Sequence, residues 1–96
     1  MEMKFTAELI EWRGPAPFYY LPIPPKLSAE IKELSPRLTY GWGVIPVSVN
    51  IGEFEFTTSL FPKDGIYLVP VKKAVRSHIG LELGDKAKCA LHFELK

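Results

Sequence analysis

Hydrophobic and polar residues alternate in several stretches of the chain, a pattern typical of strands with one buried face. The clearest stretches are residues 3–12, 41–51, 54–60 and 86–95. In the last stretch, the residues predicted to face inward are Ala87, Cys89, Leu91, Phe93 and Leu95. Two shorter segments, 18–21 and 66–69, are rich in aromatic and aliphatic residues and predict two further strands.

Two segments have helical spacing instead. Leu27, Ile31 and Leu34 follow one another at i, i+4 and i+7, which predicts a helix over 25–34 that ends at Ser35-Pro36. The second predicted helix begins near Val71, with Gly80 as its left-handed C-cap. Its apolar stripe consists of Val71, Ala74, Val75, His78 and Ile79.

The order strand, strand, helix, strand occurs twice, which predicts an internal repeat of residues 3–51 and 54–95. Residues 5–9 and 56–60 share the pattern F-T-x-x-L, and Tyr20-Leu21 and Tyr67-Leu68 each precede a proline and a helix. One unit of this size is too small to bury a stable core, whereas two units can pair their sheets and remove exposed edges. We therefore expect residues 1–96 to form one mainly β domain, a small β-barrel with two short helices.

Composition narrows the class of protein. The 96 residues are 47% hydrophobic and 24% charged, as in ordinary globular domains and unlike disordered chains. Twelve Lys and Arg against eleven Asp and Glu give a net charge of +1, so no global charge draws the chain to nucleic acid or to a membrane. With one cysteine, no apolar run of membrane-spanning length and no signal-peptide pattern, we expect a cytoplasmic protein, monomeric or weakly self-associating.

Residues 57–85, TTSLFPKDGIYLVPVKKAVRSHIGLELGD, resemble the DUF1905 family of small domains of unknown function. The opening K-F-T-A-E-L and the segment G-W-G-x-x-P-V-x-V at residues 41–49 are also similar to that family. Some members append a YdeI/OmpD-associated module, and this sequence shows no such module. The resemblance implies the double-split β-barrel fold of AbrB/MazE/MraZ-like transcription factors, and it implies no established activity.

The sequence-based candidate for a binding site is the start of the second helix. Basic residues exceed acidic ones by three between residues 63 and 88, and Lys72, Lys73 and Arg76 lie in the first turns of this helix. A helix start carries free amide donors and a partial positive charge, so an anionic ligand is a candidate there. The preceding Ser59 and Pro62 complete the predicted surface. The alternative is a solvated helix face with Arg76 paired to a carboxylate such as Asp85.

Other polar residues favour structural roles. Asp85 after Gly84 is typical of a turn. Two histidines without metal-ligand spacing make no zinc site, and we expect His78 to be partly buried and His92 to face outward. Cys89 alternates with core residues and is expected to be an inert, buried thiol. We therefore predict no catalytic residue, no cofactor and no metal.

Aromatic residues near strand ends form a second candidate surface. They are Trp12, Tyr19, Tyr20, Tyr40 and Trp42. Such residues either pack at the edge of the core or line a groove for a ligand or peptide.

Three hypotheses for function follow. The first is a non-catalytic binding module for an anionic ligand or partner, and the second is a nucleic-acid-binding module by analogy with the swapped-hairpin barrels. The third is a protein-interaction module that uses the exposed aromatic residues. An enzyme is disfavoured because no acid–base pair is indicated.

Overall fold

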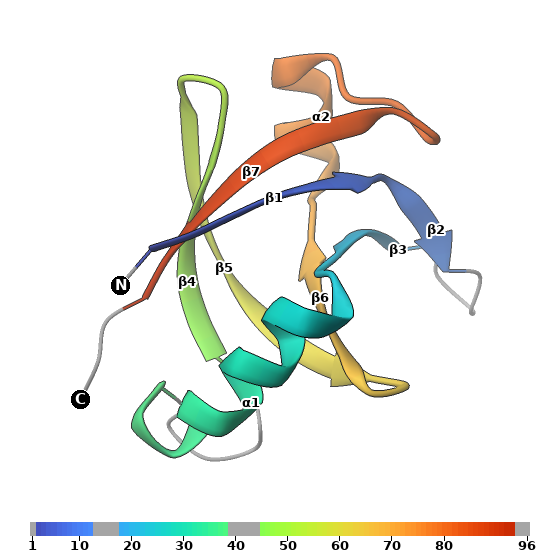
Figure 1. The fold of residues 1–96 in the computed structure, drawn as a ribbon. Helices are drawn as coiled ribbons and strands as arrows, with labels where there is room; N and C mark the ends of the chain where they lie inside the picture. Colours follow the sequence, from blue (N-terminus) through green and yellow to red (C-terminus); the bar gives the residue numbers. More distant parts are fainter. Residues whose placement is uncertain (1, 13–17, 39–44, 94–96) are drawn as a thin grey trace.

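The computed structural model describes residues 2–12, 18–38 and 45–93 (Figure 1). The strands are β1 (Glu2–Glu8), β2 (Ile10–Trp12), β3 (Phe18–Pro22), β4 (Ile45–Ile51), β5 (Phe54–Lys63), β6 (Ile66–Pro70) and β7 (Lys86–His92). The helices are α1 (Pro25–Leu38) and α2 (Lys73–Ile79). Neither helix is long and apolar enough to cross a membrane. The predictions for Tyr40, Trp42 and Leu95 fall outside the described residues.

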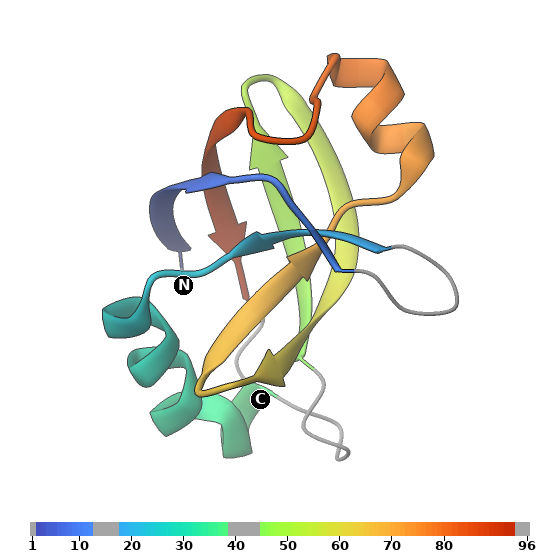
Figure 2. The same ribbon diagram turned by 90° about the vertical axis from the view of Figure 1, so that its right-hand side faces the viewer.

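The seven strands form one antiparallel sheet in the order β1-β7-β4-β5-β6-β3-β2, which curls into a half-barrel (Figures 1 and 2). This confirms the prediction of a mainly β fold with two helices. The two edge strands, β1 and β2, are consecutive in sequence and separated by Leu9 alone. The chain bends there, so the predicted strand 3–12 divides into one segment that pairs with β7 and another that pairs with β3.

The strand pairings are related by exchange of the two halves of the chain. The bent β1–β2 segment pairs with β7 and then with β3, and β5 in the same way pairs with β4 and then with β6. Only β2–β3 and β5–β6 pair within one half, and β1–β7, β4–β5, β3–β6 and β4–β7 join the two halves. The pairing scheme therefore has the two-fold symmetry expected of the predicted repeat, while the duplication itself stays a prediction.

The register of β3 and β6 corrects one detail of the predicted repeat. Tyr20 pairs with Pro70 and Pro22 pairs with Leu68, on either side of the Leu21–Val69 pair. A two-fold axis through the Leu21–Val69 pair exchanges the two strands. It makes Tyr20 equivalent to Leu68, and Pro22 equivalent to Pro70. The sequence match of Tyr20-Leu21 with Tyr67-Leu68 is shifted by one residue.

Two backbone hydrogen bonds extend this symmetry to the chain that leads into each helix. Ile23 N–H donates to the carbonyl of Tyr67, and Val71 N–H donates to the carbonyl of Tyr19, both at 2.9 Å. Under the same exchange, Ile23 is equivalent to Val71 and Tyr19 to Tyr67. The first residue of α1, Pro25, is then equivalent to Lys73, the first residue of α2.

The core fills the inside of the half-barrel. Its fully buried side chains are Leu9, Leu21, Ile23, Ile31, Ile45, Val49, Leu60, Val69 and Leu91. The predicted inward positions Ala87, Cys89, Leu91 and Phe93 are all buried. The helices lie at opposite ends of the half-barrel in Figures 1 and 2, and α1 buries Ile31 and Ser28, whereas α2 buries no residue.

Helix α1 does not end at Ser35-Pro36 as predicted, but continues through Pro36 to Leu38. Proline removes the amide that would donate to the carbonyl four residues earlier, which belongs to Lys32. The Ser35 hydroxyl donates to that carbonyl at 2.8 Å. The serine therefore replaces the missing donor, and the helix tolerates the proline.

The structure tests one predicted turn and one predicted helix end. The turn predicted for Pro62–Gly65 contains only Asp64 and Gly65, and both have the positive φ that two-residue hairpin turns require, 50° and 85°. Gly80 ends α2 in the left-handed conformation with φ 70°, as predicted.

Candidate functional site

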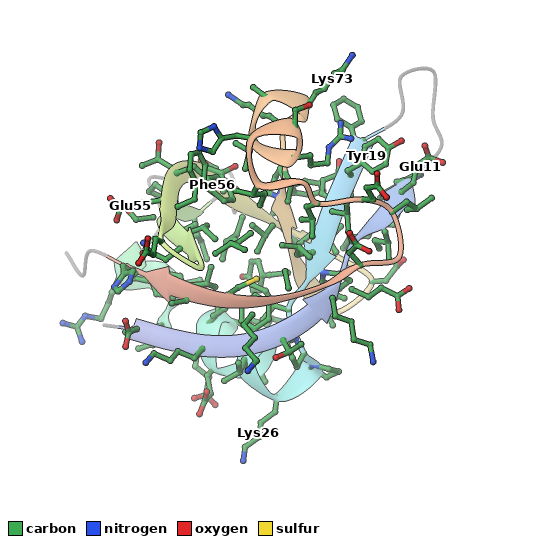
Figure 3. The ribbon with its side chains drawn as sticks, turned by 90° about the horizontal axis from the view of Figure 1, so that it is seen from above. Glu11, Tyr19, Lys26, Glu55, Phe56 and Lys73 are labelled. Atoms are coloured by element: carbon green, nitrogen blue, oxygen red, sulfur yellow. The ribbon has the colours of Figure 1, made fainter. Side chains whose placement is uncertain are left out.

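The basic residues of the predicted anion site lie at the start of α2. Lys72 is the N-cap in an extended conformation, without a side-chain capping hydrogen bond. Lys73 begins the helix and extends away from the molecule (Figure 3). Because α2 has seven residues and no buried side chain, its start offers neither a long helix dipole nor an enclosed site.

Arg76 is held by the fold. Its Nε donates to the carbonyl of Val71 at 3.2 Å, and its guanidinium carbon lies 3.7 Å from the centre of the Tyr19 ring. Figure 3 shows Tyr19 on the side of the sheet that faces α2. No ion pair joins Asp85 to Arg76 among the described residues, and the Asp85 carboxylate accepts the Glu82 N–H at 2.8 Å. This agrees with the predicted turn role of Asp85. Arg76 instead attaches α2 to β3 through its contacts with Val71 and Tyr19.

Arg76 also occupies the position equivalent to Ser28 of α1. The Ser28 hydroxyl donates to the carbonyl of Ile23 at 3.0 Å, just as Arg76 donates to the equivalent carbonyl of Val71. The hydroxyl also accepts the Tyr67 N–H at 3.1 Å. Each helix is therefore tied to the strand before it through the same position. The sequence pattern missed Ser28, although it stands beside the apolar stripe, three residues before Ile31.

Ser59 and Pro62 do not share one face of β5. The two residues are three positions apart on β5, so their side chains leave opposite faces of the strand. Pro62 pairs with Tyr67, near the β5–β6 turn, whereas α2 follows the other end of β6. The period of two along the strand was the signal that separates them. A binding role for Ser59, Pro62, Lys72, Lys73 and Arg76 stays a prediction.

A different surface collects the aromatic residues. Side chains from β2, β3, β6 and β5 lie on the face of the sheet opposite the core; we call this the outer aromatic face, and it consists of Ile10, Trp12, Phe18, Tyr20, Phe61, Lys63 and Leu68. Tyr20 is at its centre, with ring centroids 5.1 Å from Phe61, 6.3 Å from Phe18 and 6.5 Å from Trp12. These edge-on and tilted contacts hold the rings in place.

The outer aromatic face has a buried centre and an exposed margin. Tyr20 and Leu68 are 6% and 4% exposed although they lie outside the core, and burial raises the pKa of the Tyr20 hydroxyl. At the margin Phe18 is 57% exposed and Trp12 is 39% exposed. The Lys63 ammonium lies over the Trp12 ring, which places a cation within an apolar surface.

The sequence predicted part of this surface. Trp12 and Tyr20 are on it, whereas Tyr19 is on the other face of β3, under Arg76. Phe18 and Phe61 were not among the aromatic residues singled out. Alternation along β3 and β5 was the signal for both, because it places Phe18 on the same face as Tyr20, and Phe61 on the face opposite the buried Leu60.

The family model of DUF1905, described as a domain of unknown function, matches residues 5–91. The chain belongs to the DUF1905 family. This match confirms the resemblance noted from the sequence. No curated protein matches the chain. Because the description of DUF1905 assigns no activity, the function of the chain has to be argued from its surfaces.

The titratable residues of this DUF1905 chain are scattered. Among residues 2–12, 18–38 and 45–93, no three His, Cys, Asp or Glu side chains form a group that could hold a metal ion. His92 Nε2 lies 3.3 Å from a carboxylate oxygen of Glu2 at the surface. His78 is exposed rather than partly buried, and its ring stacks 4.6 Å from that of Phe54. It is exposed because α2 sits on the rim of the half-barrel and buries no residue.

Cys89 is expected to react slowly. It is 3% exposed, and burial raises the pKa of its thiol from 9.0 to about 11. Since the thiolate is the nucleophile, iodoacetamide at pH 8 should alkylate the folded domain at least roughly tenfold more slowly than the chain unfolded in urea. Equal rates would contradict the burial of the thiol.

The same shift predicts a pH dependence of stability. The folded state holds the thiol proton more tightly than the unfolded state, so this stabilisation is complete below pH 9 and is lost as the pH rises from about 9 to about 11. Urea titrations across this pH range should show a decline in the free energy of unfolding, and the decline should be smaller in Cys89→Ala than in the wild type.

Proposed function

We propose that this DUF1905 domain is a non-catalytic binding module that recognises a protein partner through the outer aromatic face. The proposal rests on aromatic side chains that are exposed to solvent and are nevertheless held in place by neighbouring rings. Phe18 and Trp12 are large, exposed side chains, and both contact the buried Tyr20 ring. Aromatic residues are enriched at the centres of interfaces, where they fill pockets of the partner.

The charge on this surface indicates what the partner presents. Lys63 lies over Trp12, and no carboxylate pairs with it among the residues that the structure describes. An acidic side chain of the partner would meet Lys63 while an apolar side chain meets Phe18. The partner is therefore anionic at the point of contact, which retains part of the first hypothesis and changes the surface.

The other hypotheses have weaker support. An anionic metabolite at α2 would meet two exposed lysines, but Arg76 is already engaged with Val71 and Tyr19. Duplex nucleic acid is disfavoured by the net charge of +1, because its binding depends on many cationic contacts with phosphates. Neither hypothesis uses the exposed aromatic residues.

The test begins with peptides selected from a random library on the wild-type domain. Their binding sites are then mapped by amide chemical shifts of ¹⁵N-labelled protein, alongside titrations with inorganic phosphate and a short DNA duplex at low and moderate salt. We expect the selected peptides to shift the amides of Trp12, Phe18 and Phe61. Phe18→Ala should weaken their binding at least roughly tenfold, as is typical of an anchor residue. Lys63→Glu should weaken the peptides that carry acidic residues.

A matched control distinguishes binding at this surface from non-specific hydrophobic binding. Leu83 is 58% exposed and lies in the turn before β7, so Leu83→Ala removes an equally exposed apolar side chain elsewhere. It should leave peptide binding unchanged. Peptides that bind Phe18→Ala as tightly as wild type would refute the proposal. Salt-sensitive shifts centred on Lys72 and Arg76 with phosphate or DNA would favour the anion site instead.

A further inference from the structure

Strand β1 is an edge of the sheet with one side unpaired among the described residues. It pairs only with β7. Leu9, at its end, donates its N–H to Asp85 at 2.9 Å and accepts the Gly84 N–H at 3.0 Å, so the backbone of Leu9 faces the β7 side. Because backbone groups alternate along a strand, those of Glu2, Lys4, Thr6 and Glu8 point away from β7. Glu8 lies there beside the end of β3, which contacts β1, whereas Glu2 and Lys4 lie at the open start of the strand.

A groove lies beside the start of β1, between Glu2–Lys4 and α1. Its volume is about 550 Å³, and its lining residues are Glu2, Met3, Lys4, Leu27, Glu30, Glu33 and Leu34. Met3, Leu27 and Leu34 are half-buried and pack against the margin of the core. In Figure 2, α1 lies below the start of β1, and the segment that leads from β3 into α1 runs between them in this view. The groove thus combines an apolar floor with an unpaired strand edge.

The rim of the groove is acidic. Glu30 and Glu33 are exposed on α1, and no cation pairs with either of them among the described residues. Glu2 lies 3.8 Å from Lys4 and 3.3 Å from His92. The lining therefore carries three carboxylates against one lysine, and it favours a cationic partner.

We propose that the groove between β1 and α1 binds an extended basic peptide segment, which adds to the sheet as a strand beside β1. Backbone hydrogen bonds to Glu2 and Lys4 hold the peptide, and alternate side chains give selectivity. Apolar side chains of the peptide contact the floor, and its lysine or arginine side chains lie near Glu30 and Glu33. This site is separate from the outer aromatic face and does not depend on the proposed function.

A second copy of the chain is the competing occupant. Two β1 strands paired antiparallel about Lys4 would place Glu2 of each copy opposite Thr6 of the other. That arrangement leaves Glu30 and Glu33 without partners, so the observed charges favour a basic peptide. A dimer formed through β1 would make the edge amides protected at high protein concentration without any peptide.

The test uses a synthetic seven-residue peptide that alternates lysine with valine. Hydrogen exchange followed by NMR should show the amides of Glu2 and Lys4 protected at least roughly tenfold when the peptide is saturating. A peptide with glutamate in place of lysine should not bind. A peptide N-methylated along the edge that faces β1 should not bind either, because it cannot donate to the strand.

Paired charge-reversal variants complete the test. Glu30→Lys with Glu33→Lys should weaken the basic peptide at least roughly tenfold at low salt. Glu53→Lys with Glu55→Lys changes the net charge equally at the exposed β4–β5 hairpin, and it should weaken the peptide much less. The proposal is overturned if the acidic peptide binds equally, if the two double variants behave alike, if millimolar basic peptide leaves the β1 amides unchanged, or if protection rises with protein concentration alone.

Discussion

Replacement of Leu21 by alanine should lower the free energy of unfolding by about 2–5 kcal/mol, the range seen when a buried leucine is truncated. Leu21 is fully buried on β3 and pairs with Val69, which is also fully buried. This pair lies at the centre of the symmetric contact between the two halves of the chain. A cavity there removes packing from both halves at once, and the antiparallel strands around it leave little freedom to collapse.

The effect is large relative to the whole stability of a small domain, which is roughly 5–15 kcal/mol. Urea unfolding at 25 °C, followed by tryptophan fluorescence and circular dichroism, measures it, and thermal unfolding should show a melting temperature lower by at least roughly 10 °C. Leu83→Ala is the matched control, because Leu83 is 58% exposed, and it should cost less than about 0.5 kcal/mol. A loss below about 1 kcal/mol for Leu21→Ala would contradict the central role of the pair.

Period-two alternation predicted the strands well because most of them have one face on the core. β7 is the clearest example, with Ala87, Cys89 and Leu91 buried and Lys86, Lys88 and His92 exposed. The pattern did not show where β1 ends and β2 begins. Leu9 stays buried through the bend, so the hydrophobic alternation continues while the pairing partner changes from β7 to β3.

Local sequence also could not supply interactions that depend on pairing. The repeat was predicted from the order of elements, the F-T-x-x-L pattern and the tyrosine–leucine matches, but the symmetry of the β3–β6 register makes Pro22, not Leu21, equivalent to Pro70 and Tyr20 equivalent to Leu68. The end of α1 was predicted at Pro36, and the Ser35 hydroxyl allows the helix to continue. In each case the deciding partner is a backbone group whose position only the folded chain defines.

The candidate site shows the same limit more strongly. The basic residues near α2 suggested an anion site, whereas Arg76 is used to hold the helix against Tyr19 and Val71. The aromatic residues were recognised as a second candidate, but their arrangement around Tyr20 requires four strands to meet. Sequence composition shows that these residues are present, and the strand order determines which of them share a surface.

Replacement of Ser28 by alanine should destabilise the fold by about 1–3 kcal/mol, the cost of leaving buried polar groups without partners. Ser28 is 1% exposed, and its hydroxyl satisfies both the Ile23 carbonyl and the Tyr67 N–H. Alanine removes only one oxygen atom, so lost packing contributes little. Both backbone groups lie where α1, β3 and β6 meet, and water has little access to replace the hydroxyl.

Ser35→Ala is the matched control, because the Ser35 hydroxyl also donates to a carbonyl of the same helix but is exposed to water. It should cost less than about 0.5 kcal/mol, since water replaces the donor and only the exposed last turn of α1, from Pro36 onward, depends on this hydrogen bond. Arg76→Ala tests the equivalent position in α2, and it should cost less than Ser28→Ala because Arg76 is only half-buried and α2 buries no side chain. Urea unfolding of the three variants measures this order. If Ser35→Ala or Arg76→Ala costs as much as Ser28→Ala, burial of the hydroxyl is not what makes this contact important.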